Sequence, residues 1–250
     1  AQEIAAQNDL DSKRRALQLV AGKEYAELKP LRSDVKLTPP NPTDMQSWVD
    51  LASKQSFPVQ QQEATTAIAK LEVKRNAAAH LPTIDFVATY GTTWQTASAL
   101  TIPVASNLTT TSIGIQLNVP LYQGGGLVSR DRQAVALAGK ADDDLDNARR
   151  TAVLTTQQTY LAVINGIAQV GALEQARVSS QSALDSNKLG YEVGVRINID
   201  VLNSQQQLYS TERDLAVARY NTITNHLRLK AAAGSLIEDD LAEVNRALSP

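Results

Sequence analysis

Side chains that usually carry catalysis or metal binding are sparse and poorly spaced in this sequence. His80 and His226 are far apart and have no partner at the spacing of metal ligands, so a non-functional role is the stronger interpretation for each. Three consecutive acids, Asp142 to Asp144, offer carboxylates for a cation. Consecutive residues on a helix point in different directions, however, which favours a solvated acidic face over a binding site.

The glycine triplet Gly124-Gly125-Gly126 could cradle a phosphate, but it lacks the Lys-Ser/Thr pair of a phosphate-binding loop. It is better interpreted as a hinge between a strand and a helix. The sequence also contains no nucleophile elbow and no triad signature. We therefore predict no catalytic residue, no cofactor-binding residue, no metal ligand and no enzyme activity.

A short turn region holds the most informative polar residues. It gathers Tyr191, Gly194, Arg196 and Asp200 between two long helical stretches. Capping explains the glycine, and an acid in the first turn of a helix is favoured by the helix dipole. Capping does not explain why a tyrosine and an arginine should lie in an exposed turn, so these two residues point to an interaction.

The elements that present this turn are long helices. From Leu127 to Leu189 no proline interrupts the chain, and small residues recur in a heptad pattern that begins at Ala134 and continues through Thr155 and Gly166 to Ala183. We expect this helix to end at Leu189–Gly190 and a returning helix to run from Ile199 to Ala232, with Asn198 as its N-cap. Small side chains let neighbouring helices approach closely, although a plain helical bundle remains an alternative.

Two strands precede the long helix. Apolar residues occupy alternate positions near 83–92 and 112–121, which predicts two β-strands joined by a Ser/Thr/Ala-rich loop over 92–111. Each strand is long enough to cross a bilayer when tilted. Tyr90, Trp94 and Tyr122 lie near the strand ends, where membrane barrels place aromatic side chains. The alternative is an ordinary half-buried hairpin.

Composition narrows the class of protein. The net charge is −2, from 24 basic and 26 acidic residues, so nothing favours nucleic acid as a partner. There is no cysteine, and aromatic residues make up only 4% of the chain. Ala-rich helices with few aromatic residues favour thin, closely packed helical layers over a thick core. Because the chain begins at Ala1 without a signal peptide, we expect a processed protein or a piece of a longer one.

Several motifs together resemble a known family. They include Leu81-Pro82-Thr83-Ile84-Asp85, the run from Val119 to Gly125, the turn from Gly190 to Arg196, Asp200-Val201-Leu202 and Ala218-Arg219-Tyr220-Asn221. In this order they resemble the C-terminal half of the TolC family of outer membrane efflux and type I secretion channels. The resemblance implies a mainly α fold. Long antiparallel coiled-coil helices would form an α-barrel, and a β-hairpin would join an outer-membrane β-barrel.

The resemblance also implies how the chain is divided. Residues 1–57 would hold the end of a first-repeat helix and an equatorial segment, 58–82 a short α-barrel helix, 83–122 the barrel hairpin with an extracellular loop at 92–111, 123–233 the long helical hairpin with a periplasmic tip at 190–199, and 234–250 an equatorial tail. Two strands in each chain cannot close a twelve-stranded barrel in a trimer, and an open edge is not tolerated in lipid. We therefore expect that this chain alone does not form the native pore.

Site roles follow from the same resemblance. Tyr191 and Arg196 match residues of the periplasmic gate, and Asp200 matches an acid that rings the lumen. The tip segment Val193, Gly194 and Val195 matches the part that contacts the periplasmic adaptor, although Val195 replaces an expected threonine. Asn203 stands where the family pattern has a second acid, which predicts weaker cation selectivity.

The implied partners are those of a tripartite system. They are two further copies in a homotrimer of the full-length protein, a periplasmic adaptor (membrane fusion protein), an inner membrane transporter of the RND or ABC type, and outer membrane lipid. The implied location is the outer membrane with an extension into the periplasm. A different class, a periplasmic adaptor or coiled-coil scaffold, would also carry a long hairpin, but it should show a lipoyl-like β domain in place of two membrane-length strands.

Overall fold

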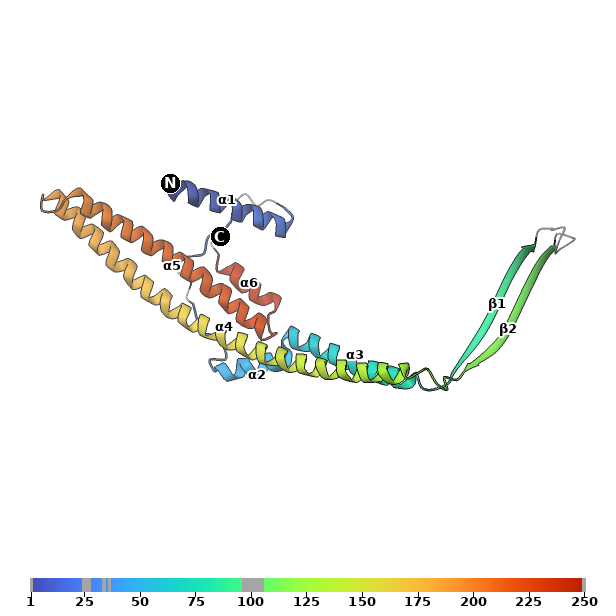
Figure 1. Cartoon of the computed structure of the whole chain (residues 1–250). Helices are drawn as coiled ribbons and strands as arrows, with labels where there is room; N and C mark the ends of the chain where they lie inside the picture. Colours follow the sequence, from blue (N-terminus) through green and yellow to red (C-terminus); the bar gives the residue numbers. More distant parts are fainter. Residues whose placement is uncertain (1, 24–27, 33–34, 36, 96–105, 249–250) are drawn as a thin grey trace. The chain divides into compact units, whose positions relative to one another are not determined.

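A computed structural model describes residues 2–23, 28–32, 35, 37–95 and 106–248. The order of elements is α1 (Gln2–Ala21), α2 (Met45–Gln55), α3 (Phe57–Ala78), β1 (Thr83–Gln95), β2 (Ser106–Asn118), α4 (Gly126–Glu192), α5 (Asn198–Ala232) and α6 (Glu238–Arg246) (Figure 1). The chain divides into two compact units, residues 57–152 and residues 1–56 with 153–250. Among the described helices, none is both long and apolar enough to cross a bilayer.

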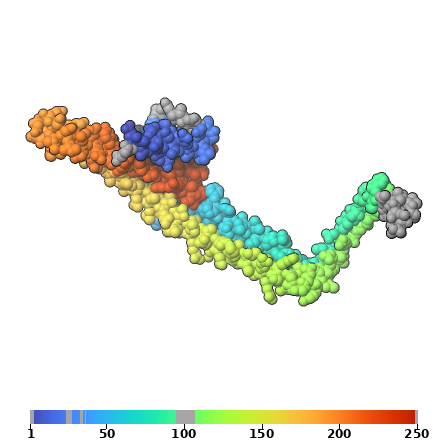
Figure 2. Space-filling model, turned by 45° about the horizontal axis from the view of Figure 1, so that its top comes forward, coloured from blue at the N-terminus to red at the C-terminus, as the bar shows by residue number. Residues whose placement is uncertain are grey.

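In the unit formed by residues 57–152, α3 packs along the first part of α4. Ala134, Ala138 and Ala141 of α4 are buried, as the small-residue pattern predicts. The hydroxyl of Thr66 donates a hydrogen bond of 3.0 Å to the carbonyl of Ala141. A side chain can reach the backbone of a neighbouring helix only where the facing residues are small. Figure 2 shows the atoms of α3 and of this part of α4, in cyan and yellow-green, packed side by side.

Exposed ion pairs join the same two helices. Lys70 lies 2.9 Å from Asp142, and Arg149 lies 2.8 Å from Glu63. Both pairs are largely exposed, and exposed pairs contribute at most about 1 kcal/mol. The cluster of Val59 with two α4 residues, Leu145 and Ala152, therefore contributes more to holding the helices together.

The two strands form an antiparallel hairpin, as the alternation predicts. Ile84 pairs with Leu117, Phe86 with Ile115, and Ala88 with Ile113, so the apolar residues of both strands share one face. The strands extend further toward their connecting loop than predicted, since β1 continues to Gln95 and β2 begins at Ser106, but β2 ends at Asn118 and not at residue 121. The proposed loop 92–111 is therefore wrong at both ends, where Thr-rich sequence forms strand, and its centre at 96–105 lies outside the described residues.

In the other unit, α2 packs against α4 and α5. Asp44 caps α2 by accepting a hydrogen bond of 3.0 Å from the backbone N–H of Ser47, which also lowers the pKa of the Asp44 carboxyl. Trp48 follows, and its indole N–H donates 2.7 Å to the carbonyl of Pro42. Its ring is buried against Val163 of α4 and Leu229 of α5, which fixes where the three helices meet.

The heptad pattern on α4 changes position after Ala152. We predicted that the row of small residues would continue through Thr155 to Ala183, but both of these residues are exposed. The structure buries Thr156, Val163, Val170 and Leu184 instead, at seven-residue multiples after Thr156. The displacement coincides with the point at which α4 leaves α3 and packs against α5 and α2. The predicted coiled-coil arrangement is confirmed, with a different row of residues in its second half.

Candidate functional site

The turn between α4 and α5 is the candidate site, and it is closed by a Schellman motif. Gly194 has φ of +79° and follows the helix as its C′ residue. The N–H of Val195 donates to the carbonyl of Gly190 at 2.9 Å, and the N–H of Gly194 donates to the carbonyl of Tyr191 at 3.1 Å. These are the two hydrogen bonds that define the motif. They satisfy carbonyls that the helix end would otherwise leave free.

This geometry corrects two predictions about the helix ends. The long helix does not end at Leu189–Gly190 but continues to Glu192, because Gly190 keeps a helical φ and only Gly194 turns the chain. Asn198 is the first residue of α5 and not its N-cap. The N-cap is Ile197, whose side chain makes no capping hydrogen bond. The non-helical tip is therefore shorter than the predicted range 190–199.

The structure brings some of the predicted site residues together. Arg196 lies in the turn and Asp200 in the first turn of α5, with Nη1 of Arg196 3.9 Å from Oδ2 of Asp200. Tyr191 lies in the last turn of α4 and is half exposed. Within the part of the chain that the structure describes, its hydroxyl has no hydrogen-bond partner. Tyr191 and Arg196 thus both present polar groups at the end of the hairpin.

The remaining predicted residues form the outermost surface of the turn. Val193 is 65% exposed and Val195 is 75% exposed, on either side of Gly194. Two exposed valines beside a glycine make a small apolar surface with accessible backbone. This surface is accessible to another molecule.

The two charged side chains at the tip, Arg196 and Asp200, interact only weakly with each other. The side chains of Arg196 and Asp200 are 58% and 35% exposed, and their separation of 3.9 Å is long for an ion pair. Exposed pairs contribute at most about 1 kcal/mol. Either group can therefore exchange this contact for one with another partner at little cost.

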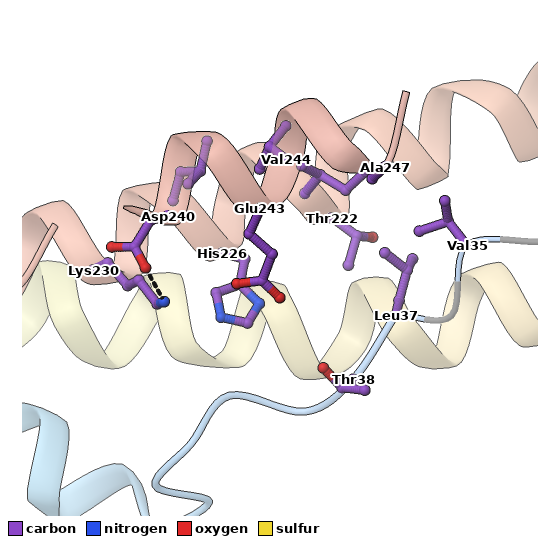
Figure 3. Close-up of a pocket in the computed structure, with 12 residues that line it drawn as sticks. Val35, Leu37, Thr38, Thr222, His226, Lys230, Asp240, Glu243, Val244 and Ala247 are labelled. Carbon is purple, nitrogen blue, oxygen red and sulfur yellow. Dashed lines mark hydrogen bonds and ion pairs between the residues drawn. The ribbon is translucent and has the colours of Figure 1, made fainter. Parts of the chain in front are cut away.

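A second feature, a cavity of about 110 Å³, was not predicted from the sequence. It lies between α5, α6 and the residues Val35, Leu37 and Thr38 (Figure 3). Nζ of Lys230 is 2.5 Å from Oδ1 of Asp240, and the other carboxylate oxygen of Asp240 accepts a hydrogen bond of 2.9 Å from the N–H of Ile237. Asp240 thus caps α6 and ties it to α5.

Burial changes how readily His226 binds a proton in this cavity. It lowers the pKa of His226, and the Lys230 charge lowers it further, while Glu243 and Asp240 act in the opposite direction. The hydrogen bonds from Lys230 and from the Ile237 N–H lower the pKa of Asp240. His226 and Lys230 are four residues apart on one helix face, a spacing visible in the sequence. Asp240 and Glu243 of α6 become neighbours of these residues only because α6 packs back against α5.

Neither feature has the arrangement of a metal centre. Throughout the described residues, no group of three or more histidines and acids is placed to hold a metal ion. The two histidines lie in different units, and the acids of the predicted acidic face include Asp142 and Asp144, which pair with lysines at 2.9 and 2.6 Å.

Comparisons with known proteins agree on one family. The sequence model of the outer membrane efflux protein family matches residues 48–235. The chain is 33% identical over 257 residues to the outer membrane protein TolC of Escherichia coli (strain K12), with 100% of this chain and 52% of that protein covered. It is 32% identical over 243 residues to the alkaline protease secretion protein AprF of Pseudomonas aeruginosa, with 96% and 50% covered.

The fold agrees with these sequence relationships. The crystal structure of the outer membrane protein VceC from Vibrio cholerae superposes with a TM-score of 0.69 at 18% identity, with 92% of this chain and 54% of that chain covered. This chain spans about half the length of the relatives that it matches. With long antiparallel helices, a paired hairpin and a family match over most of its length, the chain belongs to the outer membrane efflux protein family.

Proposed function

We propose that this chain forms part of a subunit of an outer membrane channel, through which an efflux or type I secretion system releases its cargo. The subunit is a passive duct that performs no catalysis, and an inner membrane pump supplies the energy. Family membership and the names of the relatives, TolC and the secretion protein AprF, support this role. We place the channel in the outer membrane, with its helices extending into the periplasm.

The observation that carries the proposal is the apolar face of the β1–β2 hairpin. Its large side chains are between 60% and 78% exposed; they are Ile84, Phe86, Tyr90, Trp94, Ile113, Ile115 and Leu117. Their register puts them on one side of the sheet, with Asp85, Thr89, Ser112 and Gln116 on the other. An uncovered apolar face of this kind needs another apolar phase. Lipid on one side and water on the other meet that need.

A two-stranded sheet in lipid requires further strands, because unpaired backbone groups are costly there. We propose that a subunit containing this chain contributes four strands and that three subunits close a twelve-stranded barrel. The helices then form an α-barrel, and residues 1–57 and 234–250 form an equatorial layer around it. The partners are a periplasmic adaptor and an RND or ABC transporter of the inner membrane.

The turn between α4 and α5 is the proposed periplasmic entrance. Tyr191 and Arg196 act as gate residues that bind neighbouring helices, and Asp200 forms a ring of negative charge in the lumen. Val193, Gly194 and Val195 contact the adaptor. The exposure of the two valines and the weak pairing of Arg196 with Asp200 support these roles, because both leave the tip free to bind other chains.

The test is leak conductance in planar bilayers, measured on the whole subunit that contains this chain. The double substitution Tyr191→Phe with Arg196→Ser should raise the leak, since it removes a hydroxyl and a guanidinium that hold the entrance closed. The control is Tyr209→Phe with Arg213→Ser, which removes the same groups from exposed positions along α5. An unchanged leak in the gate variant would contradict the gate roles. A wild-type subunit that forms no conducting trimer would contradict the channel itself.

A further inference from the structure

We infer that Gly190 is a positioning residue for Arg196, and that its missing side chain is what seats the arginine at the tip. This inference rests on the proposed gate role of Arg196. A Cβ atom on Gly190 would lie 2.6 Å from Cγ of Arg196 and 3.4 Å from its Cβ. Carbon atoms in contact are normally about 3.5–4.0 Å apart. The stem of Arg196 therefore occupies the space that any side chain at 190 would need.

Backbone conformation does not account for this glycine. Gly190 lies inside α4 and does not have a positive φ, unlike Gly194 four residues later. Glycine within a helix is unfavourable compared with alanine, so the position carries a cost that a purely local structure would avoid. Close approach of the returning chain is the feature at residue 190 that requires glycine.

The backbone around Gly190 is fixed, so it cannot move aside for a larger residue. The carbonyl of Gly190 accepts two hydrogen bonds, from the N–H of Val195 at 2.9 Å and from the N–H of Arg196 at 3.0 Å. The first hydrogen bond belongs to the Schellman motif. The second holds the backbone of Arg196 against the last turn of α4. A side chain at 190 would therefore be accommodated by rotation of the Arg196 side chain about χ1.

That rotation would change where the charge lies. With the stem against Gly190, the guanidinium is 3.9 Å from the Asp200 carboxylate. A different χ1 rotamer swings every atom beyond Cβ to a new position and takes the guanidinium away from Asp200. Gly190→Ala should thus affect the gate as removal of the arginine does, although it leaves every charged group in the protein.

Two readouts test the inference on the whole subunit. The first is the Arg196 Nε–Hε resonance in a ¹H–¹⁵N spectrum, which reports the arginine independently of transport. The second is leak conductance in planar bilayers. Gly190→Ala should shift the resonance and raise the leak by the same factor as Arg196→Ala. The matched control is Gly171→Ala, also within α4, where an added Cβ meets no atom within 4 Å among the described residues and neither readout should change.

The double variant Gly190→Ala with Arg196→Ala separates positioning from a general loss of structure. Alanine at 196 has no Cγ, so the overlap disappears and the double variant should fold with the thermal midpoint of Arg196→Ala. Its leak should equal that of Arg196→Ala alone. A leak that adds to the effect of Arg196→Ala, or an unmoved resonance in Gly190→Ala, would overturn the inference. A shifted resonance in a subunit that does not conduct would support positioning and reject the channel.

Discussion

Gly234 should be among the most sensitive glycines in this chain, and the reason can be measured. It follows α5 with φ of +72°, and its Cα faces the backbone carbonyl of Gln55 at the end of α2. A Cβ there would overlap backbone atoms of Gln55 and approach the backbone nitrogen of Ser56 to 3.1 Å. Rotation of a side chain cannot relieve an overlap with backbone. Gly234→Ala must therefore separate α2 from the α5–α6 turn.

Two effects add in this variant. A left-handed conformation costs an alanine about 1–2 kcal/mol. Overpacking adds about 1–3 kcal/mol, so the free energy of unfolding should fall by about 2–5 kcal/mol. Gly194→Ala is the control, because it has a φ of +79° but no atom within 4 Å of an added Cβ among the described residues. It should show only the first effect.

The assay is thermal or urea unfolding followed by circular dichroism at 222 nm. For a protein of this size, 1 kcal/mol shifts the melting temperature by about 2–4 °C. The two variants should therefore differ by at least about 2 °C, with Gly234→Ala the lower. Equal melting temperatures would refute the claim that the α5–α6 turn packs directly on the backbone at the end of α2.

Three further changes test other parts of the structure. Leu229→Ala should lower the free energy of unfolding by about 2–5 kcal/mol, because Leu229 is fully buried beside Trp48; Leu202→Ala, at a half-exposed position, should change it by less than about 0.5 kcal/mol in urea titrations. The pKa of His226 is lowered below its ordinary value of 6.5, so the unfolded chain binds the proton more readily and stability should fall as the pH drops below about 6.5. It should level off below the folded pKa, and His226→Gln should remove this fall in urea titrations between pH 7.5 and 5. In the whole channel, Asp200→Asn should reduce the preference for cations, which a reversal potential in a KCl gradient measures; an unchanged potential would exclude Asp200 from the lumen.

The hairpin illustrates what alternation in a sequence can and cannot predict. Every second residue from Ile113 to Leu117 is apolar, and this pattern correctly predicted a strand. In the structure the apolar residues of both strands share one face, and a shift of one residue would move one apolar set to the other face. The strand ends were missed, since residues such as Thr92 and Thr109 are polar like a loop. They are also β-branched, and in the structure they pair directly with each other.

A repeating pattern in a helix also leaves its packing partner undetermined. The small-residue pattern predicted a closely packed α4, but a heptad does not say which neighbour it faces. The buried row therefore shifts from Ala152 to Thr156 where the partner helix changes. The cavity beside His226 was missed for a related reason. Lys230 and Asp240 belong to different helices, and only the turn at Gly234 brings them together.

Two glycines in one turn have different physical roles, and this distinction underlies the proposed gate. Gly194 supplies a backbone angle, whereas Gly190 supplies empty space. Sequence alone could not separate them, and we placed the helix end at the wrong one. The buried cluster of Trp48, Val163 and Leu229 holds α2, α4 and α5 together in the same unit, far along the helices from the turn, so a change at the tip need not disturb it. The Arg196–Asp200 contact is long and exposed, and contacts of this kind are exchanged at little cost in free energy. We therefore propose that the gate opens by movement of side chains at the turn while α4 and α5 remain packed.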